Sequence, residues 1–92
     1  MFTLKICKKA VAGTLESSDA LVEVEPGSGI AIDLESAVLS QFGDAIEASV
    51  RAVLAAFGVT GAKLRVVDRG ALDCTIRARV ETAIKRAKGD EA

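Results

Sequence analysis

Alternation of apolar and polar residues predicts a β-hairpin near the N-terminus. Residues 20–25 have the sequence ALVEVE, in which valines alternate with glutamates as in a half-exposed strand. Residues 9–16 form a second apolar segment that predicts the partner strand. Ser17, Ser18 and Asp19 lie between the two segments, and such residues favour turns because their side chains bond nearby backbone groups. We therefore expect these three residues at the tip of a hairpin.

A third strand and a long helix are predicted after the hairpin. Beyond a Pro- and Gly-rich break, residues 30–35 again alternate between apolar and polar side chains. Ser36 is a suitable N-cap, and the apolar residues after it recur every three or four positions until Gly58, a glycine typical of helix C-termini. The predicted apolar stripe of this helix consists of Val38, Phe42, Ile46, Val50, Val53, Leu54 and Phe57.

The C-terminal part predicts a fourth strand and a segment that fits two interpretations. Residues 62–68 (AKLRVVD) are the strand, and a turn follows at 69–70. Apolar residues from Leu72 onward fit helical spacing, while those at 72–80 also alternate as in a strand. Length, composition and the basic residues near the end favour a helix over about 72–87.

The element order β-β-β-α-β-α predicts an α+β fold. We expect a small two-layer sandwich, in which a roughly four-stranded, mainly antiparallel sheet carries two helices on one face. Residues 1–92 are expected to form a single domain, because a chain of this length rarely holds more than one.

Composition excludes several classes of function. The chain has no His, so Ser-His-Asp and Cys-His catalysis and His-ligated metal sites are ruled out. Twelve Lys and Arg residues against thirteen Asp and Glu give a net charge of −1, which argues against nucleic-acid binding. Cys7 and Cys74 form no C-x-x-C pair and fit a reducing compartment. With no apolar run long enough for a membrane span and no signal peptide, we expect a complete cytoplasmic protein.

The remaining polar residues offer little catalytic machinery. Glu16 and Asp19 are expected to be solvated charges, and Asp68 and Asp73 to serve a turn and a helix start. Cys74 is expected to be a small core residue. The basic residues of the last segment are expected on a solvated helix face beside Glu81: Arg77, Arg79, Lys85 and Arg86.

Ser17 and Ser18 lie on the predicted exposed tip with no base to activate them. A serine placed in this way is a poor nucleophile by itself. However, an exposed tip can enter the active site of another enzyme without unfolding the sheet. The two residues are therefore either plain turn serines or a site that another enzyme modifies.

Three segments resemble the acyl carrier, or gamma, subunit of citrate lyase. They are AVAGTLESSD at 10–19, QFGDAI at 41–46 and DRGALDCTIRARVETA at 68–83. The resemblance extends over nearly the whole chain in the same order, and a more distant similarity exists to the acyl carrier subunit of malonate decarboxylase. Ser18 is a departure, because glycine is expected after the carrier serine in this family.

The resemblance implies a non-catalytic carrier subunit of a lyase complex in citrate fermentation. It places the carrier serine at Ser17, with Ser18 as the second choice, and implies a covalent 2′-(5″-phosphoribosyl)-3′-dephospho-coenzyme A joined through a phosphodiester. The terminal thiol would carry acetyl or citryl as a thioester while the alpha and beta subunits of citrate lyase convert citrate to acetate and oxaloacetate. A prosthetic-group transferase (holo-carrier synthase) and an acetylating ligase are the other implied partners. Residues near the serine are the expected recognition surface of the transferase: Thr14, Leu15, Glu16 and Asp19.

Two further interpretations remain open from the sequence. A carrier subunit of a related citramalate lyase or of malonate decarboxylase would have the same architecture. A non-carrier interaction module, binding a partner through a sheet edge, would need no modified serine and would tolerate Ser17→Ala.

Overall fold

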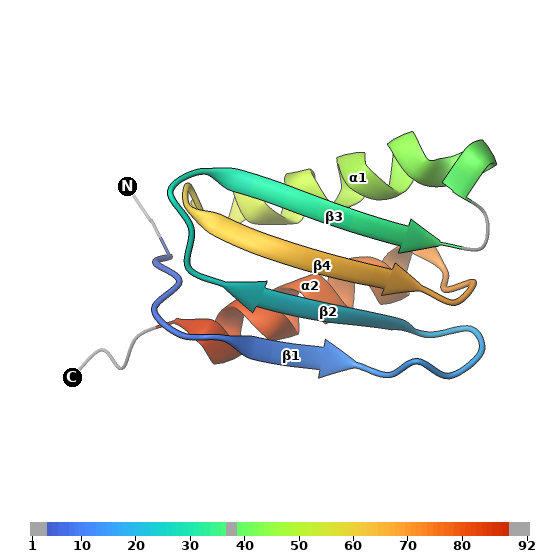
Figure 1. Ribbon diagram of the computed structural model, residues 1–92, viewed down its shortest axis with the longest axis horizontal. Helices are drawn as coiled ribbons and strands as arrows, with labels where there is room; N and C mark the ends of the chain where they lie inside the picture. The colour runs from blue at the N-terminus through green and yellow to red at the C-terminus, as the bar shows by residue number, and fades with distance from the viewer. Residues whose placement is uncertain (1–3, 37–38, 89–92) are drawn as a thin grey trace.

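Four strands form one mixed sheet with the order β1-β2-β4-β3. The computed structural model describes residues 4–36 and 39–88. Strand β2 pairs antiparallel with both β1 and β4, whereas β3 runs parallel to β4 (Figure 1). The strands are β1 Ala10–Gly13, β2 Ala20–Glu25, β3 Ile30–Ser36 and β4 Ala62–Asp68. The predicted α+β order and the mainly antiparallel sheet are confirmed.

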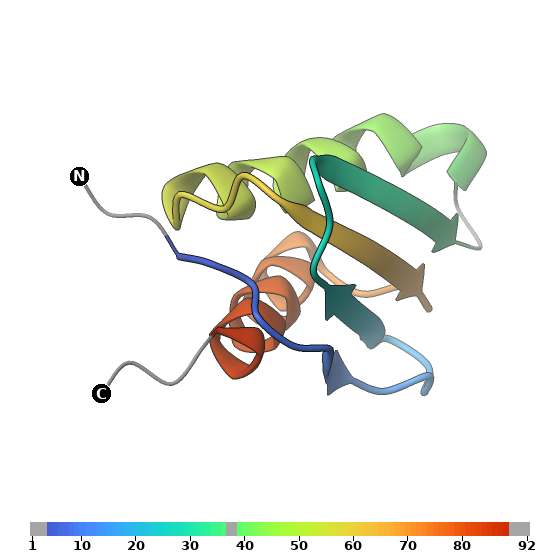
Figure 2. The ribbon, with the colours of Figure 1, turned by 60° about the vertical axis from the view of Figure 1, so that its left-hand side comes forward.

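Two helices cover one face of this sheet (Figure 2). Helix α1 (Leu39–Ala56) packs on β3, helix α2 (Asp73–Ala87) packs on β1 and β2, and the two helices contact each other. The core between the layers is aliphatic, and its largest fully buried side chains are Leu54, Leu64, Ile84, Val22, Val24, Val50, Val66 and Val80. Over the described residues, neither helix has the length and apolarity needed to cross a membrane.

Helix α1 ends as its sequence predicts but begins later. Gly58 has a positive φ of 66°, and its N–H donates to the carbonyl of Ala55 while the N–H of Val59 donates to that of Leu54. This is the Schellman arrangement that a C-terminal glycine allows. At the other end, Ser36 is the last residue of β3, so the predicted helix start was too early. Val38 and the side chain of Phe42 lie outside the described residues.

The ambiguous C-terminal segment is a helix. Its buried side chains recur at helical spacing, and they are Ile76, Val80, Ala83, Ile84 and Ala87. The helix, Asp73–Ala87, matches the predicted range of about 72–87, and Leu72 is its N-cap and is 72% exposed. The expectation that Cys74 is a core residue was wrong, since Cys74 is exposed. Two positions correspond to about 200° around a helix, so Cys74 lies nearly opposite the buried Ile76.

The N-terminal segment closes one end of the core. Leu4 and Ile6 are buried, the N–H of Leu4 donates to the carbonyl of Phe57 (2.9 Å), and Ile6 forms an isolated bridge with Lys88. The hairpin loop (residues 14–19) and the β4–α2 turn (residues 69–72) lie at the opposite end (Figure 1).

Candidate functional site

Gly13 fixes the point where strand β1 stops and the hairpin loop begins. Its φ is +88°, and a Cβ at this position would lie 1.8 Å from the carbonyl oxygen of Ala20. Only glycine combines this backbone angle with such a close approach. Strand β1 is therefore shorter than the predicted 9–16, and residues 14–19 form the loop.

The hairpin loop contains a tight turn with Ser17 and Ser18 at its centre. The N–H of Asp19 donates to the carbonyl of Glu16 (3.2 Å), which closes a four-residue turn. Ser18 has a φ of 68° and is the one non-glycine residue with positive φ in the described ranges 4–36 and 39–88. A positive φ at the third position is typical of type II turns, which favour glycine there. This geometry explains why glycine is expected at position 18.

Ser17 and Ser18 are both exposed. Neither hydroxyl has a hydrogen-bond partner among the residues that the structure describes. The backbone N–H of Ser18 donates to the carbonyl of Arg69 (2.8 Å), and the N–H of Arg69 donates to the carbonyl of Asp19 (2.9 Å). The hairpin loop is thus anchored to the β4–α2 turn through its backbone, while the Ser17 side chain stays accessible.

Asp19 fixes the base of the hairpin loop. Its carboxylate accepts two hydrogen bonds from the Arg79 guanidinium (2.9 and 3.2 Å), one from the Thr14 hydroxyl (2.8 Å) and one from the N–H of Ala20 (2.7 Å). The bonds from Arg79, then Thr14, then Ala20 lower the pKa of Asp19 to about 2. The expectation of a solvated charge was wrong for Asp19, whose side chain is only 14% exposed.

These contacts limit the chemistry available at the loop. A carboxylate with so low a pKa is a poor general base, and both Asp19 oxygens already accept hydrogen bonds. No group of His, Cys, Asp or Glu side chains within the described residues could hold a metal ion. The described contacts therefore leave the Ser17 hydroxyl accessible, and none of them joins it to a side chain that could act as a base.

Asp68 serves the β4–α2 turn and Asp73 lies at the start of helix α2, as predicted. Asp68 is 2% exposed, and its carboxylate accepts hydrogen bonds from the Ser36 hydroxyl (2.8 Å) and from the N–H groups of Gly70 (3.2 Å) and Ala71 (2.9 Å). Asp73 accepts hydrogen bonds from Ser49 and Arg77, which together lower its pKa.

The basic face predicted on α2 is only partly solvated. Lys85 and Arg77 form exposed ion pairs within the helix, at 2.7 Å from Glu81 and Asp73 respectively. By contrast, Arg79 holds Asp19, and the guanidinium of Arg86 donates to the carbonyl of Val11 (2.8 Å) on β1. These two arginines therefore join α2 to the hairpin. Sequence reasoning missed the role of Arg79, which lies 60 positions from Asp19.

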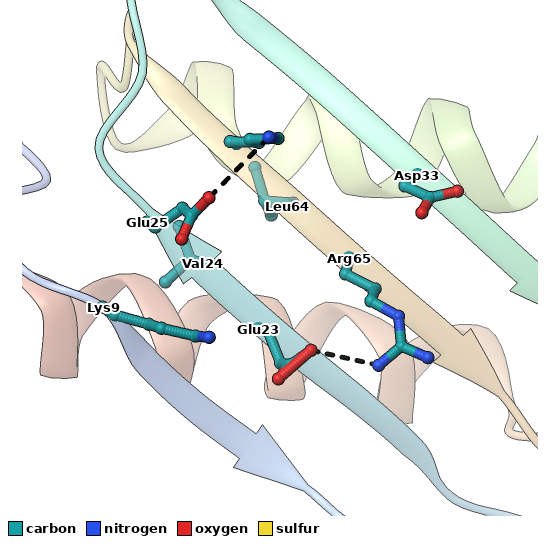
Figure 3. Close-up of a pocket in the computed structure, with 8 residues that line it drawn as sticks. Lys9, Glu23, Val24, Glu25, Asp33, Leu64 and Arg65 are labelled. Carbon is teal, nitrogen blue, oxygen red and sulfur yellow. Dashed lines mark hydrogen bonds and ion pairs between the residues drawn. The ribbon is translucent and has the colours of Figure 1, made fainter.

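The sheet face without helices carries a second cluster of charges (Figure 3). A hollow of about 200 Å³ lies there between cross-strand ion pairs, Glu23 with Arg65 (3.1 Å) and Glu25 with Lys63 (3.9 Å). Exposed pairs of opposite charge contribute at most about 1 kcal/mol each and keep such a face polar. The arrangement is that of a solvated sheet surface, and the lining residues include no Ser, Thr or Cys nucleophile.

Known proteins resemble this chain over almost its whole length. The family described as malonate decarboxylase delta subunit (MdcD) matches residues 7–87. The citrate lyase acyl carrier protein of Haemophilus influenzae is 56% identical over 84 residues, covering 91% of this chain and 88% of that protein. That of Treponema denticola is 51% identical over 84 residues, covering 91% of this chain and 97% of that protein. This chain belongs to the citrate lyase acyl carrier protein family.

Membership of the family confirms the resemblance read from residues 10–19, 41–46 and 68–83. A similar fold occurs in the crystal structure of a Pseudomonas malonate decarboxylase hetero-tetramer in complex with malonate. The match has a TM-score of 0.79, covers 94% of this chain and 90% of that chain, and has 18% sequence identity. At that identity the similarity is one of fold.

Proposed function

We propose that this chain is the acyl carrier subunit of a citrate lyase, and that Ser17 bears its prosthetic group. The observation that carries the proposal is the exposed Ser17 hydroxyl on an anchored loop, with no hydrogen bond from that hydroxyl to a side chain of the described residues that could act as a base. An enzyme with its own active serine would hold a base against it, whereas a carrier needs only accessibility. The identity of 51–56% to citrate lyase acyl carrier proteins supports the same role.

The group proposed at Ser17 is 2′-(5″-phosphoribosyl)-3′-dephospho-coenzyme A, joined to Oγ through a phosphodiester. When bound, it supplies a thiol that holds the acyl group as a thioester during cleavage of citrate to acetate and oxaloacetate. Ser17 suits this attachment, since a substituent on an exposed side chain at a loop tip requires no repacking of the core. This chain then contributes a rigid tether, which keeps the acyl group at high effective concentration near the lyase active sites.

Position 17 suits the attachment better than position 18. The Ser18 N–H is bound to Arg69, and its positive φ belongs to the turn, so this residue has a structural task that glycine could perform. Ser17 has no such backbone constraint among the described contacts. These observations support Ser17 as the carrier residue.

The proposed partners follow from the resemblance to citrate lyase acyl carriers. In this proposal the alpha and beta subunits of the lyase perform the chemistry on the acyl group. A prosthetic-group transferase installs the arm and supplies the base for Ser17, and a ligase acetylates the thiol. We place this assembly in the cytoplasm. Leu15, which is 53% exposed, and Glu16 are available to the transferase, while Thr14 serves to hold Asp19.

A carrier role in malonate decarboxylase is the second candidate, because the matching family carries that description. The identity of 18% to the Pseudomonas malonate decarboxylase chain, against 56% to a citrate lyase carrier, favours citrate lyase. Citramalate lyase would require the same carrier chemistry.

Reconstitution tests the proposal and the alternatives together. The transferase, its nucleotide donor, the acetylating ligase with its substrates and the two lyase subunits are combined with wild-type, Ser17→Ala or Ser18→Ala carrier, and acyl-dependent cleavage is assayed with citrate, citramalate and malonate. We expect activity on citrate with the wild type and with Ser18→Ala, and none with Ser17→Ala. Full activity of Ser17→Ala would contradict the proposal and favour an interaction module. Cleavage of malonate or citramalate alone would reassign the substrate.

A further inference from the structure

Leu72 departs from the local rules of helix formation. It occupies the N-cap of α2 with φ −70° and ψ 157°, and its side chain makes no capping hydrogen bond. Ser, Thr, Asp and Asn are preferred there, and Leu is among the least favourable residues. Leu72 is also 72% exposed, the highest value of the large exposed hydrophobic residues in the described ranges. A large apolar side chain that neither caps the helix nor enters the core points to a use outside the fold.

A hollow of about 390 Å³ lies beside Leu72, between the β4–α2 turn and the N-terminal half of α1. Much of its lining is apolar, from Ala45, Ile46, Ala71, Leu72 and Ile76. Two carboxylates also border it, but Asp68 already accepts three hydrogen bonds and Asp73 accepts hydrogen bonds from Ser49 and Arg77. The hollow therefore suits an apolar side chain of a partner better than a polar ligand.

This surface is continuous with the hairpin loop that carries Ser17. The backbone hydrogen bond from Ser18 to Arg69 (2.8 Å) joins that loop to the β4–α2 turn, and Gly70, the next residue, already lines the hollow. Leu15, 53% exposed, adds an apolar side chain within the hairpin loop itself. Both loops lie at the same end of the molecule (Figure 1).

We infer that Leu72 and the adjoining hollow, together called the Leu72 patch, form the docking site for the enzyme that modifies Ser17. This inference rests on the proposed function. In the modification, Ser17 Oγ forms a bond to a phosphorus of the nucleotide donor, and the bond from that phosphorus to the oxygen of the donor's phosphate leaving group breaks. The leaving group takes the electron pair, and the proton of the Ser17 hydroxyl passes to a base of the enzyme. The enzyme must therefore cover Ser17 itself, and a standard interface of about 800 Å² per partner extends onto the neighbouring turn. The lyase subunits act at the distant end of the arm and need not cover this surface.

The test uses a substitution that separates docking from folding. Leu72→Ser removes the apolar side chain but introduces a good N-cap, so the thermal midpoint of the unmodified carrier should hold or rise. Transfer of the prosthetic group to the full-length chain is followed by intact mass at varied carrier concentration. We expect the KM for the carrier to rise about tenfold or more, the effect typical of losing an interface anchor, while kcat changes little. Leu72→Met should retain the wild-type KM.

Val11→Thr is the matched control, because Val11 is an exposed apolar residue (40%) on strand β1 outside the patch. Its KM should equal that of the wild type. An unchanged KM for Leu72→Ser would overturn the inference. So would normal transfer to Leu72→Ser followed by failure of the modified variant with the lyase subunits, since the patch would then serve those subunits. Absence of any transfer to wild-type Ser17 would instead overturn the proposed function, and this inference with it.

Discussion

Gly13→Ala tests how the end of strand β1 sets the hairpin loop. A residue with a Cβ at a φ of +88° is strained by about 1–2 kcal/mol. The new Cβ would also lie 1.8 Å from the carbonyl oxygen of Ala20, a backbone atom that cannot rotate away. Strand β1 or β2 must therefore shift, which adds about 1–3 kcal/mol, as overpacking does. Together these effects lower the free energy of unfolding by about 2–5 kcal/mol, and the thermal midpoint by more than about 10 °C.

Two other glycines separate the backbone strain from the effect of the close approach to Ala20. Gly70 has a φ of +89° but no atom within 4 Å of an added Cβ, so Gly70→Ala should show the backbone strain alone, about 1–2 kcal/mol. Gly29 has neither a positive φ nor a close neighbour, and Gly29→Ala should be neutral or stabilising by up to about 1 kcal/mol. Urea unfolding followed by circular dichroism measures all three variants.

The predicted order of destabilisation is Gly13→Ala, then Gly70→Ala, then Gly29→Ala. Equal losses for Gly13→Ala and Gly70→Ala would show that the close approach to Ala20 contributes nothing. In that case Gly13 would not be what fixes the start of the hairpin loop. Gly13→Ala should also slow modification of Ser17, because the shifted strand carries the loop with it.

Three other predictions concern single side chains. Ser18→Gly should raise the free energy of unfolding by about 0.5–1 kcal/mol, because glycine adopts positive φ without strain; urea unfolding tests this, and transfer to Ser17 should persist. Asp19→Asn should be less stable than the wild type at neutral pH. The folded pKa of Asp19, about 2, lies below its ordinary 3.8, so its stabilisation is complete above 3.8 and lost as the pH falls toward 2. The difference in thermal midpoint between the wild type and Asp19→Asn should therefore shrink as the pH falls from 3.8 toward 2. A difference that stays constant would contradict the role of the Arg79 contact. Cys74→Ser should alter the free energy of unfolding by less than about 0.5 kcal/mol and leave transfer unchanged, because the thiol is exposed; a large loss in urea unfolding would contradict its placement.

Much of the fold follows from local patterns. Strand β4 matches its predicted bounds of 62–68, where Lys63 and Arg65 alternate with buried residues over the first half of the strand. The parallel pairing of β3 with β4 was missed, although the helix predicted between these two strands is the crossover connection that parallel neighbours require. The exposed position of Leu72 was missed because apolar spacing alone does not fix where a helix begins. That of Cys74 was missed because a small apolar residue was expected in the core, although helical spacing places it nearly opposite Ile76.

The sequence predicted the position of the candidate site at the hairpin tip, but not the contacts that hold the hairpin loop in place. Turn residues between two apolar segments located Ser17, and the family resemblance assigned it a role. The contact between Arg79 and Asp19 joins residues 60 positions apart, so no local pattern could indicate it. The requirement for glycine at position 13 arises from the approach of the neighbouring strand, which only the folded chain reveals.

Intact-mass analysis with fragmentation tests the central claim most directly. The chain is isolated from cells whose citrate lyase is active, so that the modifying enzymes are present. The account predicts an added mass equal to one phosphoribosyl-dephospho-coenzyme A group, located by fragmentation at Ser17. An unmodified chain from cells with active lyase would contradict the carrier role. The same mass found at Ser18 would retain that role but contradict the assignment of the residue.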